Sequence, residues 1–263
     1  MAKYALDQAW QSEKDRLDAL ASIYEDGTER HIQALDLSEG WRCAEIGGGT
    51  GTVARWLCER VGPSGHVVAT DLDTRFLDQL DMPNLEVRRH NIVEEPLEPA
   101  TYDLIHVRLV LMHLGENCGR ALTHMVEALK PGGWLIAEEF DDANNGSMMH
   151  PPDEQVEKVT AAIPALFQQL GVDPYYGRKL PSELEAAGLT NIHAEVRTTL
   201  VASGSPQIRA LTFLLEFLRD RFVDAQILSS EEVDHAIAAA NVPGRRWHAP
   251  PLMVAAWGRR PAQ

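Results

Sequence analysis

A glycine-rich segment, Glu45-Ile-Gly-Gly-Gly-Thr-Gly51, carries the strongest chemical signal in the sequence. Its glycines are Gly47, Gly48, Gly49 and Gly51. Glycines allow a tight turn and let a ligand approach the backbone without a Cβ in its way. Residues 52–59 are compatible with a helix, whose first N–H groups favour an anionic group. The pattern therefore predicts a strand, a nucleotide-binding loop and a helix.

An acidic residue follows at a spacing that suits ribose binding. Asp71 lies twenty positions after Gly51, at the end of the stretch Val67-Val-Ala-Thr70. An acid that ends the second strand can accept hydrogen bonds from two ribose hydroxyls. The segment Gly49-Thr-Gly-Thr-Val-Ala54 also fits the dinucleotide pattern G-x-G-x-x-A. The loop by itself therefore leaves an NAD(P)-dependent oxidoreductase open.

Further segments resemble, in order and spacing, the class I S-adenosylmethionine-dependent methyltransferases. They are Glu45–Gly51, Asp71 with Leu72 after it, His90-Asn-Ile92, Tyr102–Leu114 and Ala128–Ala137. The resemblance covers residues 38–140 and is nearest to the ubiquinone/menaquinone-type and natural-product small-molecule enzymes. It implies S-adenosylmethionine as cofactor and a small or medium-sized acceptor.

The resemblance also implies roles for single residues. The glycine-rich segment and Asp71 are expected to bind the methyl donor, with Asn91 and Ile92 at the adenine. Asn91 stands where aspartate is more usual, but it keeps a carbonyl oxygen for an adenine N–H. Arg108 is expected at the donor's methionine end or in the acceptor pocket. Glu45 and the lack of a hydride-transfer constellation disfavour the oxidoreductase, whereas a fold relative that catalyses a cyclisation, or only binds, stays open.

Methyl transfer from a sulfonium is an in-line displacement, so the protein mainly positions and desolvates the reactants. A base is needed only where the acceptor must lose a proton. His113 is the predicted base, because a histidine pKa suits work near neutrality; packing or donor contact is the alternative. His106 is expected in the core or in a supporting role. His150, in the polar loop 141–153, could reach a substrate.

Side chains outside the expected sheet are candidates for ligand contacts. Arg16 could pair with the donor carboxylate or lie on a solvated helix face. Trp10 and Tyr24 could close over the ligands, although their helical spacing also suits simple packing. Tyr175 and Tyr176 are candidates for the wall of the acceptor pocket.

No metal is predicted. The acids nearest to a ligand set are Glu138, Glu139, Asp141 and Asp142. Glu138 and Glu139 are adjacent in an expected strand and therefore point to opposite faces. No pair of His, Cys or acidic residues has convincing ligand spacing.

Composition sets the broad class. The chain has 263 residues, 44% of them hydrophobic, and a net charge of −15. That charge disfavours nucleic-acid backbones and anionic membranes as partners. Three cysteines without a C-x-x-C pair suggest reduced core residues, and neither a signal peptide nor a long apolar run is evident, so the cytoplasm is expected. The expected partner is a small-molecule acceptor, and a homodimer is left open.

Alternating strands and helices predict an α/β, Rossmann-like fold: a seven-stranded, mostly parallel sheet with helices on both faces and an added helical cap. Strands are expected at 41–46, 66–71, 85–90, 102–107, 133–140, 192–201 and 252–257, the last antiparallel. Helices are expected at 5–24, 28–35, 51–61, 74–80, 116–129, 155–170, 182–187, 206–225 and 230–240. Residues 1–37 are predicted as an amino-terminal helical lid, and 38–263 as the methyltransferase domain with cap helices at about 144–188 and 206–241.

Overall fold

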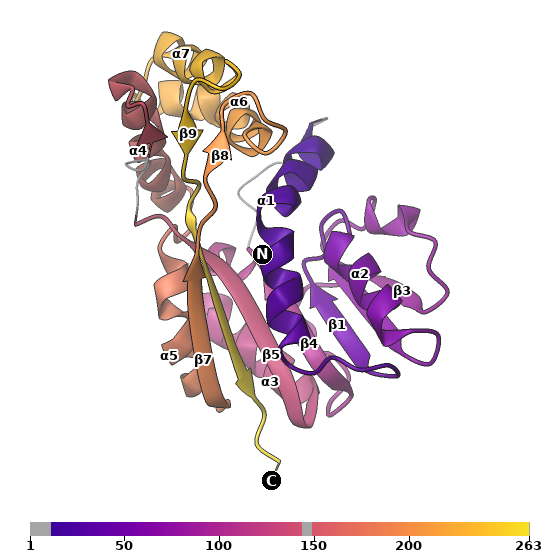
Figure 1. Cartoon of the computed structure of the whole chain (residues 1–263). Coiled ribbons are helices and arrows are strands. Elements are labelled where there is room, and N and C mark those ends of the chain that lie inside the picture. Colours follow the sequence, from indigo (N-terminus) through magenta and orange to yellow (C-terminus); the bar gives the residue numbers. More distant parts are fainter. Residues whose placement is uncertain (1–11, 144–148, 263) are drawn as a thin grey trace.

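A central β-sheet organises the protein. The computed structural model describes residues 12–143 and 149–262, which contain a seven-stranded sheet in the order β3-β2-β1-β4-β5-β10-β7 (Figure 1). The parallel strands are β1 (Arg42–Ile46), β2 (His66–Asp71), β3 (Leu85–Arg89), β4 (Tyr102–Arg108) and β5 (Leu129–Asp141). β10 (Leu252–Arg259) runs antiparallel to both β5 and β7 (Thr190–Arg197). The predicted mostly parallel sheet with an antiparallel last strand is confirmed.

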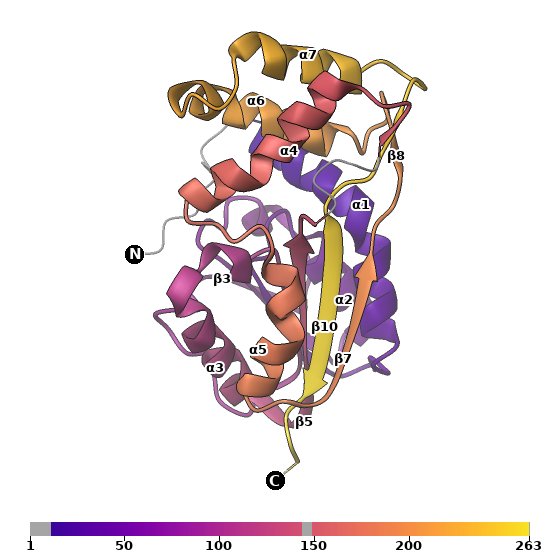
Figure 2. The same cartoon turned by 90° about the vertical axis from the view of Figure 1, so that its left-hand side faces the viewer.

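Apolar side chains cover both faces of the sheet. One cluster joins Cys43, Val67 and Ala69 of the strands to α2 (Thr52–Val61) and the end of α1 (Glu13–Gln33). The alternate strand residues, such as Ala44 and Val68, belong to a second cluster with α3 (Cys118–Ala128) and α5 (Leu180–Ala186). Successive strand residues point to opposite faces, so near-continuous apolar strands require two helical layers. Figure 2 shows α3 and α5 on one side of the sheet, with α1 and α2 on the other.

A helical cap lies beyond the carboxyl ends of the parallel strands (Figure 1). It consists of α4 (Glu154–Gln169), α6 (Arg209–Asp224) and α7 (Ser230–Ala240), of which α7 contacts both others and α6 also contacts α1. A small antiparallel sheet joins β6 (Met149–His150), β9 (Trp247–His248) and β8 (Val201–Ala202). α5, which falls within the predicted cap segment 144–188, packs on β10 and β7 of the main sheet.

Several element boundaries differ from the sequence prediction. α1 runs from Glu13 to Gln33 without the expected interruption between 24 and 28. A Cβ at Gly27 would overlap Nη1 of Arg197, so the glycine leaves room for this flexible side chain of β7 against α1. The expected helix 74–80 is reduced to a 3-10 turn, η1 (Leu77–Gln79). The expected strand 192–201 is divided between β7 and β8, and α4 continues through Pro164.

Candidate active site

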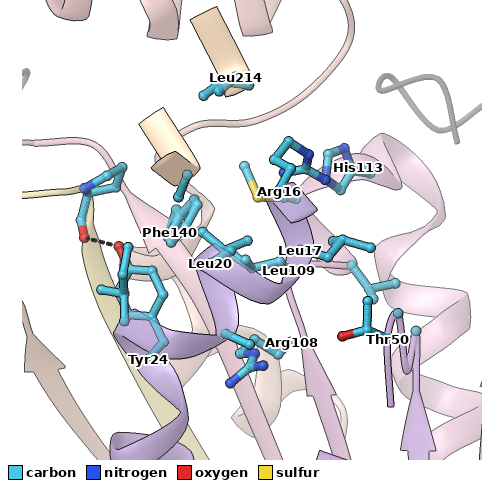
Figure 3. A pocket seen from close by; sticks show the side chains of 18 of the residues that line it. Arg16, Leu17, Leu20, Tyr24, Thr50, Arg108, Leu109, His113, Phe140 and Leu214 are labelled. Atoms are coloured by element: carbon cyan, nitrogen blue, oxygen red, sulfur yellow. Dashed lines mark hydrogen bonds between the residues drawn. The ribbon is translucent and has the colours of Figure 1, made fainter. Parts of the chain in front are cut away.

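One cavity of about 300 Å³ lies at the carboxyl ends of the parallel strands, between the sheet, α1 and the cap. Figure 3 shows the α1 side chains of Leu17 and Leu20 between Thr50 of the glycine-rich segment and Leu214 of α6, with Tyr24 to one side. Open α/β sheets bind ligands in this position. The glycine-rich loop after β1 lines one end of the cavity. Residues of the cap helices, such as Ile163 of α4 and Leu214 of α6, line the other end, which we call the cap end.

The glycine loop (Gly47–Gly51) is fixed to the end of β2. The N–H groups of Gly47 and Gly48 donate to the carbonyl oxygen of Thr70 at 2.8 and 2.9 Å. The N–H of Gly49 donates to Oδ2 of Asp71 at 3.0 Å, and the N–H of Asp73 donates to Oδ1 of Asp71 at 3.1 Å. The Asp71 carboxylate therefore lies on the cavity wall with both oxygens oriented by the backbone.

Two loop glycines are required by the fold itself. Gly47 and Gly51 have φ values of 71° and 79°, a region that side chains disfavour. A Cβ at Gly47 would overlap Val110, and a Cβ at Gly51 would overlap Leu80. Gly49 also has a positive φ, 54°, but a Cβ there would meet only Leu17 Cδ1 at 3.8 Å. Space therefore remains above Gly49, where the sequence predicted that a ligand approaches the backbone.

The other predicted donor residues gather around this loop. Leu72, Asn91, Ile92 and Arg108 all line the cavity. Oδ1 of Asn91 accepts the N–H of Val93 at 3.1 Å, which fixes the side chain in a turn after β3. These residues and the glycine loop fit S-adenosylmethionine: Asp71 could hold the ribose, and Asn91 and Ile92 could contact the adenine.

Arg16 also lines the cavity, and it forms an ion pair with its own helix neighbour Glu13. Nε and Nη2 of Arg16 donate to the Glu13 carboxylate at 2.7 and 2.8 Å, and both side chains are buried. The predicted contact between Arg16 and a donor carboxylate would therefore compete with this ion pair. Trp10, predicted to contact substrate, lies outside the described residues.

A chain of buried polar groups lies beneath the glycine loop. Nδ1 of His106 faces Oε2 of Glu45 at 2.6 Å, and its Nε2 faces Oε2 of Glu138 at 3.3 Å. Glu138 also contacts Nδ1 of His31 at 2.9 Å and accepts a hydrogen bond from Thr28. Burial alone would lower the pKa of His106, but the two carboxylates raise it to about 9. The charged imidazolium therefore links β1, β4 and β5 and, through Glu138, also α1.

This chain ends at the cavity. Nη1 of Arg108 donates to Oγ1 of Thr28 at 2.9 Å, so Glu138 orients the arginine through the threonine. Glu45, predicted as a cofactor residue, directs its carboxylate to His106 and supports the loop from below. The sequence placed His106 in the core, but it gave no signal that Thr28 and His31 would complete the chain from a distant helix.

The predicted base, His113, lies at the end of the 3-10 turn η2 (Leu111–His113) and lines the cavity beside Arg16 (Figure 3). The Glu139 carboxylate fixes this turn by accepting the N–H groups of Val110 and Leu111 at 2.9 and 2.7 Å. Burial, with a smaller contribution from Arg16, lowers the pKa of His113 to about 4. The imidazole is therefore neutral at physiological pH, but its conjugate acid is too acidic for efficient general-base catalysis.

The predicted acceptor residues are only partly brought together. Tyr24 lines the cavity, and its hydroxyl donates to the carbonyl oxygen of Pro251 at 3.0 Å. His150 lies on β6 with an exposed side chain, apart from the cavity lining. Tyr175 stacks with Arg178, and Tyr176 is buried in the core near Cys118. None of these three residues lines this cavity, because sequence position did not reveal which face the loop and turn residues present.

Asp142 also lines the cavity, and the sequence analysis did not name it as a candidate for contact with the acceptor. It directly follows β5, is only 8% exposed and lines the cavity. Its position at the carboxyl end of a central parallel strand was the available signal.

Within the described residues, no group of His, Cys, Asp and Glu is arranged to hold a metal ion. Nor is any described helix long and apolar enough to cross a bilayer.

Comparison with known proteins agrees with this geometry. Residues 44–135 match a family model described as a methyltransferase domain. Methyltransferase str2 of Strobilurus tenacellus is 29% identical over 214 residues, which are 80% of this chain and 75% of that protein. The ubiquinone/menaquinone biosynthesis C-methyltransferase UbiE of Bordetella parapertussis is 31% identical over 144 residues, 51% of this chain and 55% of that protein.

A solved structure shares the fold. Phosphoethanolamine N-methyltransferase 2 of Haemonchus contortus, in complex with phosphomonomethylethanolamine and S-adenosylhomocysteine, matches with a TM-score of 0.60 at 16% identity. The match covers 99% of this chain and 60% of that one. The solved structure agrees in fold, and the glycine loop, Asp71, the methyltransferase family model and the sequence relatives together support a class I S-adenosylmethionine-dependent methyltransferase with S-adenosylmethionine as its cofactor.

Proposed function

We propose that this protein methylates a small, largely apolar acceptor that binds at the cap end of the cavity. The observation that carries the proposal is the continuity of the cavity from the glycine loop to an apolar chamber. The chamber is lined by Leu20, Leu109, Met112, Phe140, Met149, Ile163, Phe167, Leu211 and Leu214. Small-molecule sites commonly combine such apolar walls with a few placed polar groups.

The walls come from separate parts of the chain. Leu20 belongs to α1, Phe140 to β5, Ile163 to α4 and Leu214 to α6. Residues distant in sequence thus enclose the acceptor end, which supports exclusion of water during the reaction. Desolvation favours transfer from a charged sulfonium to a nucleophile, because water would otherwise stabilise the separated reactants.

The chain's own residues have defined tasks in this reaction. When bound, S-adenosylmethionine supplies an activated methyl group. Asp71 and the glycine loop would hold its nucleoside half, and Glu139 keeps η2 in place along the cavity. Glu45, His106 and Glu138 maintain the floor beneath the loop. Positioning of this kind supplies much of the rate enhancement of a two-substrate reaction.

The names of the relatives point to different acceptors. UbiE is named for ubiquinone/menaquinone biosynthesis, whereas the Haemonchus contortus enzyme is a phosphoethanolamine N-methyltransferase. The acceptor class is therefore argued from the cavity. To test it, we would incubate the protein with S-adenosylmethionine and a panel of apolar and strongly charged acceptors. Mass spectrometry should find products one methylene heavier among the apolar ones. Products found only among phosphorylated or multiply charged acceptors would overturn the proposal.

A further inference from the structure

Asp142 has an environment that differs from those of the other buried acids near the sheet. Glu45 and Glu138 contact His106, Glu139 accepts backbone N–H groups, and Asp141 pairs with Arg178 at 2.6 Å. In the part of the chain that the structure describes, the Asp142 carboxylate accepts no hydrogen bond, although the residue is only 8% exposed and lines the cavity.

Such a group needs an explanation. A buried carboxylate without a partner is costly, and natural proteins keep one mainly where it has a ligand or a chemical role. The backbone N–H of Asp142 donates to the carbonyl oxygen of Pro174 at 2.9 Å, so the residue is anchored at the end of β5. The cavity wall around it includes Tyr24, Phe140 and Pro251. Asp142 therefore presents a fixed carboxylate to the cavity beside the apolar side chains of the chamber.

We infer that Asp142 accepts a hydrogen bond from a hydroxyl group of an otherwise apolar acceptor and takes its proton during methylation. The inference rests on the proposed function. As the new C–O bond forms, the C–S bond of the donor breaks and its electron pair stays on sulfur. The hydroxyl proton moves to a carboxylate oxygen of Asp142 and later to solvent, so charge and atoms balance.

The charges around the site favour a neutral hydroxyl over other acceptor groups. An anionic acceptor would be repelled by the Asp142 carboxylate. Asp142 would attract a cationic amine, but Arg108, which like Asp142 acts electrostatically on Tyr24, would repel it and offset that attraction. Other titratable or charged residues also line the cavity: Glu13, Arg16, Glu45, Asp71, Asp73, Arg75, His90, His113 and His248. Beside Asp142 in the chain lies Asp141 with its partner Arg178.

The protonation of Asp142 supports this role. Burial, with a smaller contribution from Asp141, raises the pKa of Asp142 to about 6. The side chain is thus a carboxylate at neutral pH, yet it holds a proton better than an exposed aspartate. It is also a better-matched base than His113, whose pKa is about 4.

A pair of probes tests the hydrogen bond without relying on turnover. 2-Naphthol carries a hydroxyl, and 2-methoxynaphthalene has the same rings without the proton. Binding of each would be measured by calorimetry at pH 8, with the protein saturated by S-adenosylhomocysteine. The wild type should prefer the naphthol, and Asp142→Asn should reduce that preference at least fivefold, because a charge-assisted hydrogen bond becomes a neutral one.

The matched control is Asp141→Asn, which changes the neighbouring acid while leaving Asp142 in the cavity. It should keep the preference for naphthol. Because it removes a repelling charge, it should also move the pH at which naphthol binding weakens to a value below that of the wild type. In the wild type this weakening should occur as pH falls through about 6, where Asp142 gains its proton.

Three results would overturn the inference: no preference in the wild type, an undiminished preference in Asp142→Asn, or tighter binding of the cationic probe 2-(aminomethyl)naphthalene. S-Adenosylhomocysteine binding is measured first in the same protein. Failure at that step contradicts the proposed methyl transfer, whereas normal binding of this nucleoside without a naphthol preference contradicts the role of Asp142 alone.

Discussion

Replacing His106 by glutamine tests the buried chain beneath the glycine loop. The imidazolium lies between Glu45 and Glu138 with no exposed surface, and these carboxylates raise its pKa from 6.5 to about 9. A tenfold change in proton affinity is worth about 1.4 kcal/mol, so the folded state favours the charged form by roughly 3 kcal/mol. That is a large fraction of the roughly 5–15 kcal/mol that keeps a domain folded.

The sign of the pH dependence follows from which state holds the proton. Below pH 6.5, His106 is charged in both the folded and the unfolded chain, so its full contribution to stability is present. Above pH 6.5 the unfolded chain loses the proton while the folded protein keeps it. The contribution therefore declines as pH rises and is lost through about pH 9. Between pH 7 and pH 9 the loss should be about 2 kcal/mol.

Urea unfolding at a series of pH values between 6 and 10 measures this effect. The free energy of unfolding of the wild type should fall over that range more steeply than that of His106→Gln. His66→Gln is the control, because it removes a partly exposed histidine that pairs with Glu86 outside the buried chain and should keep the steeper fall that His106 causes. If the wild type and His106→Gln have parallel pH profiles, His106 does not carry a stabilising charge, and the account of the buried chain is wrong.

Two further substitutions test the glycine loop and the predicted base. Gly47→Ala should lower the free energy of unfolding by about 1–3 kcal/mol and weaken S-adenosylhomocysteine binding, because φ is 71° and the Cβ would overlap Val110. Gly119→Ala in α3, where a Cβ has open space, should be neutral or slightly stabilising by urea unfolding; equal losses in both variants would refute the steric argument. His113→Ala should reduce the methylation rate less than Asp142→Asn, since the pKa of His113 is about 4. A larger effect of His113→Ala on single-turnover rates would restore His113 as the base.

The sequence was sufficient where local pattern and function coincide. The apolar strand before Gly47 and the acid at Asp71 lie next to each other in the structure because parallel strands end at one edge of the sheet. The sequence was insufficient where contacts between residues distant in the chain determine the position of a side chain. The side chain of Arg197 on β7 packs beside Gly27 of α1, and the orientation of Arg108 depends on Thr28 of α1. Neither contact has a local sequence signature.

The residues at the acceptor end of the cavity were also difficult to predict from the sequence. Tyr175 and Tyr176 were attractive as aromatic residues near the ligand edge, but the 3-10 turn η4 (Tyr176–Lys179) directs Tyr176 into the core. The low pKa of His113 arises from burial and from Arg16 on a separate helix. The two-residue strands β6, β8 and β9 are too short to show an alternating pattern.

Calorimetric titration with S-adenosylhomocysteine, in the wild type and in Asp71→Asn, tests the central claim most directly. The wild type should bind this nucleoside and not NAD(P). Asp71→Asn should bind it at least tenfold more weakly, because ribose hydroxyls lose charge-assisted hydrogen bonds worth roughly 1.5–3 kcal/mol each. Asp78→Asn, at an exposed position on η1, should bind like the wild type. Unchanged affinity in a folded Asp71→Asn, or tight NAD(P) binding without binding of S-adenosylhomocysteine, would contradict the assignment of the glycine loop and Asp71 as the donor site.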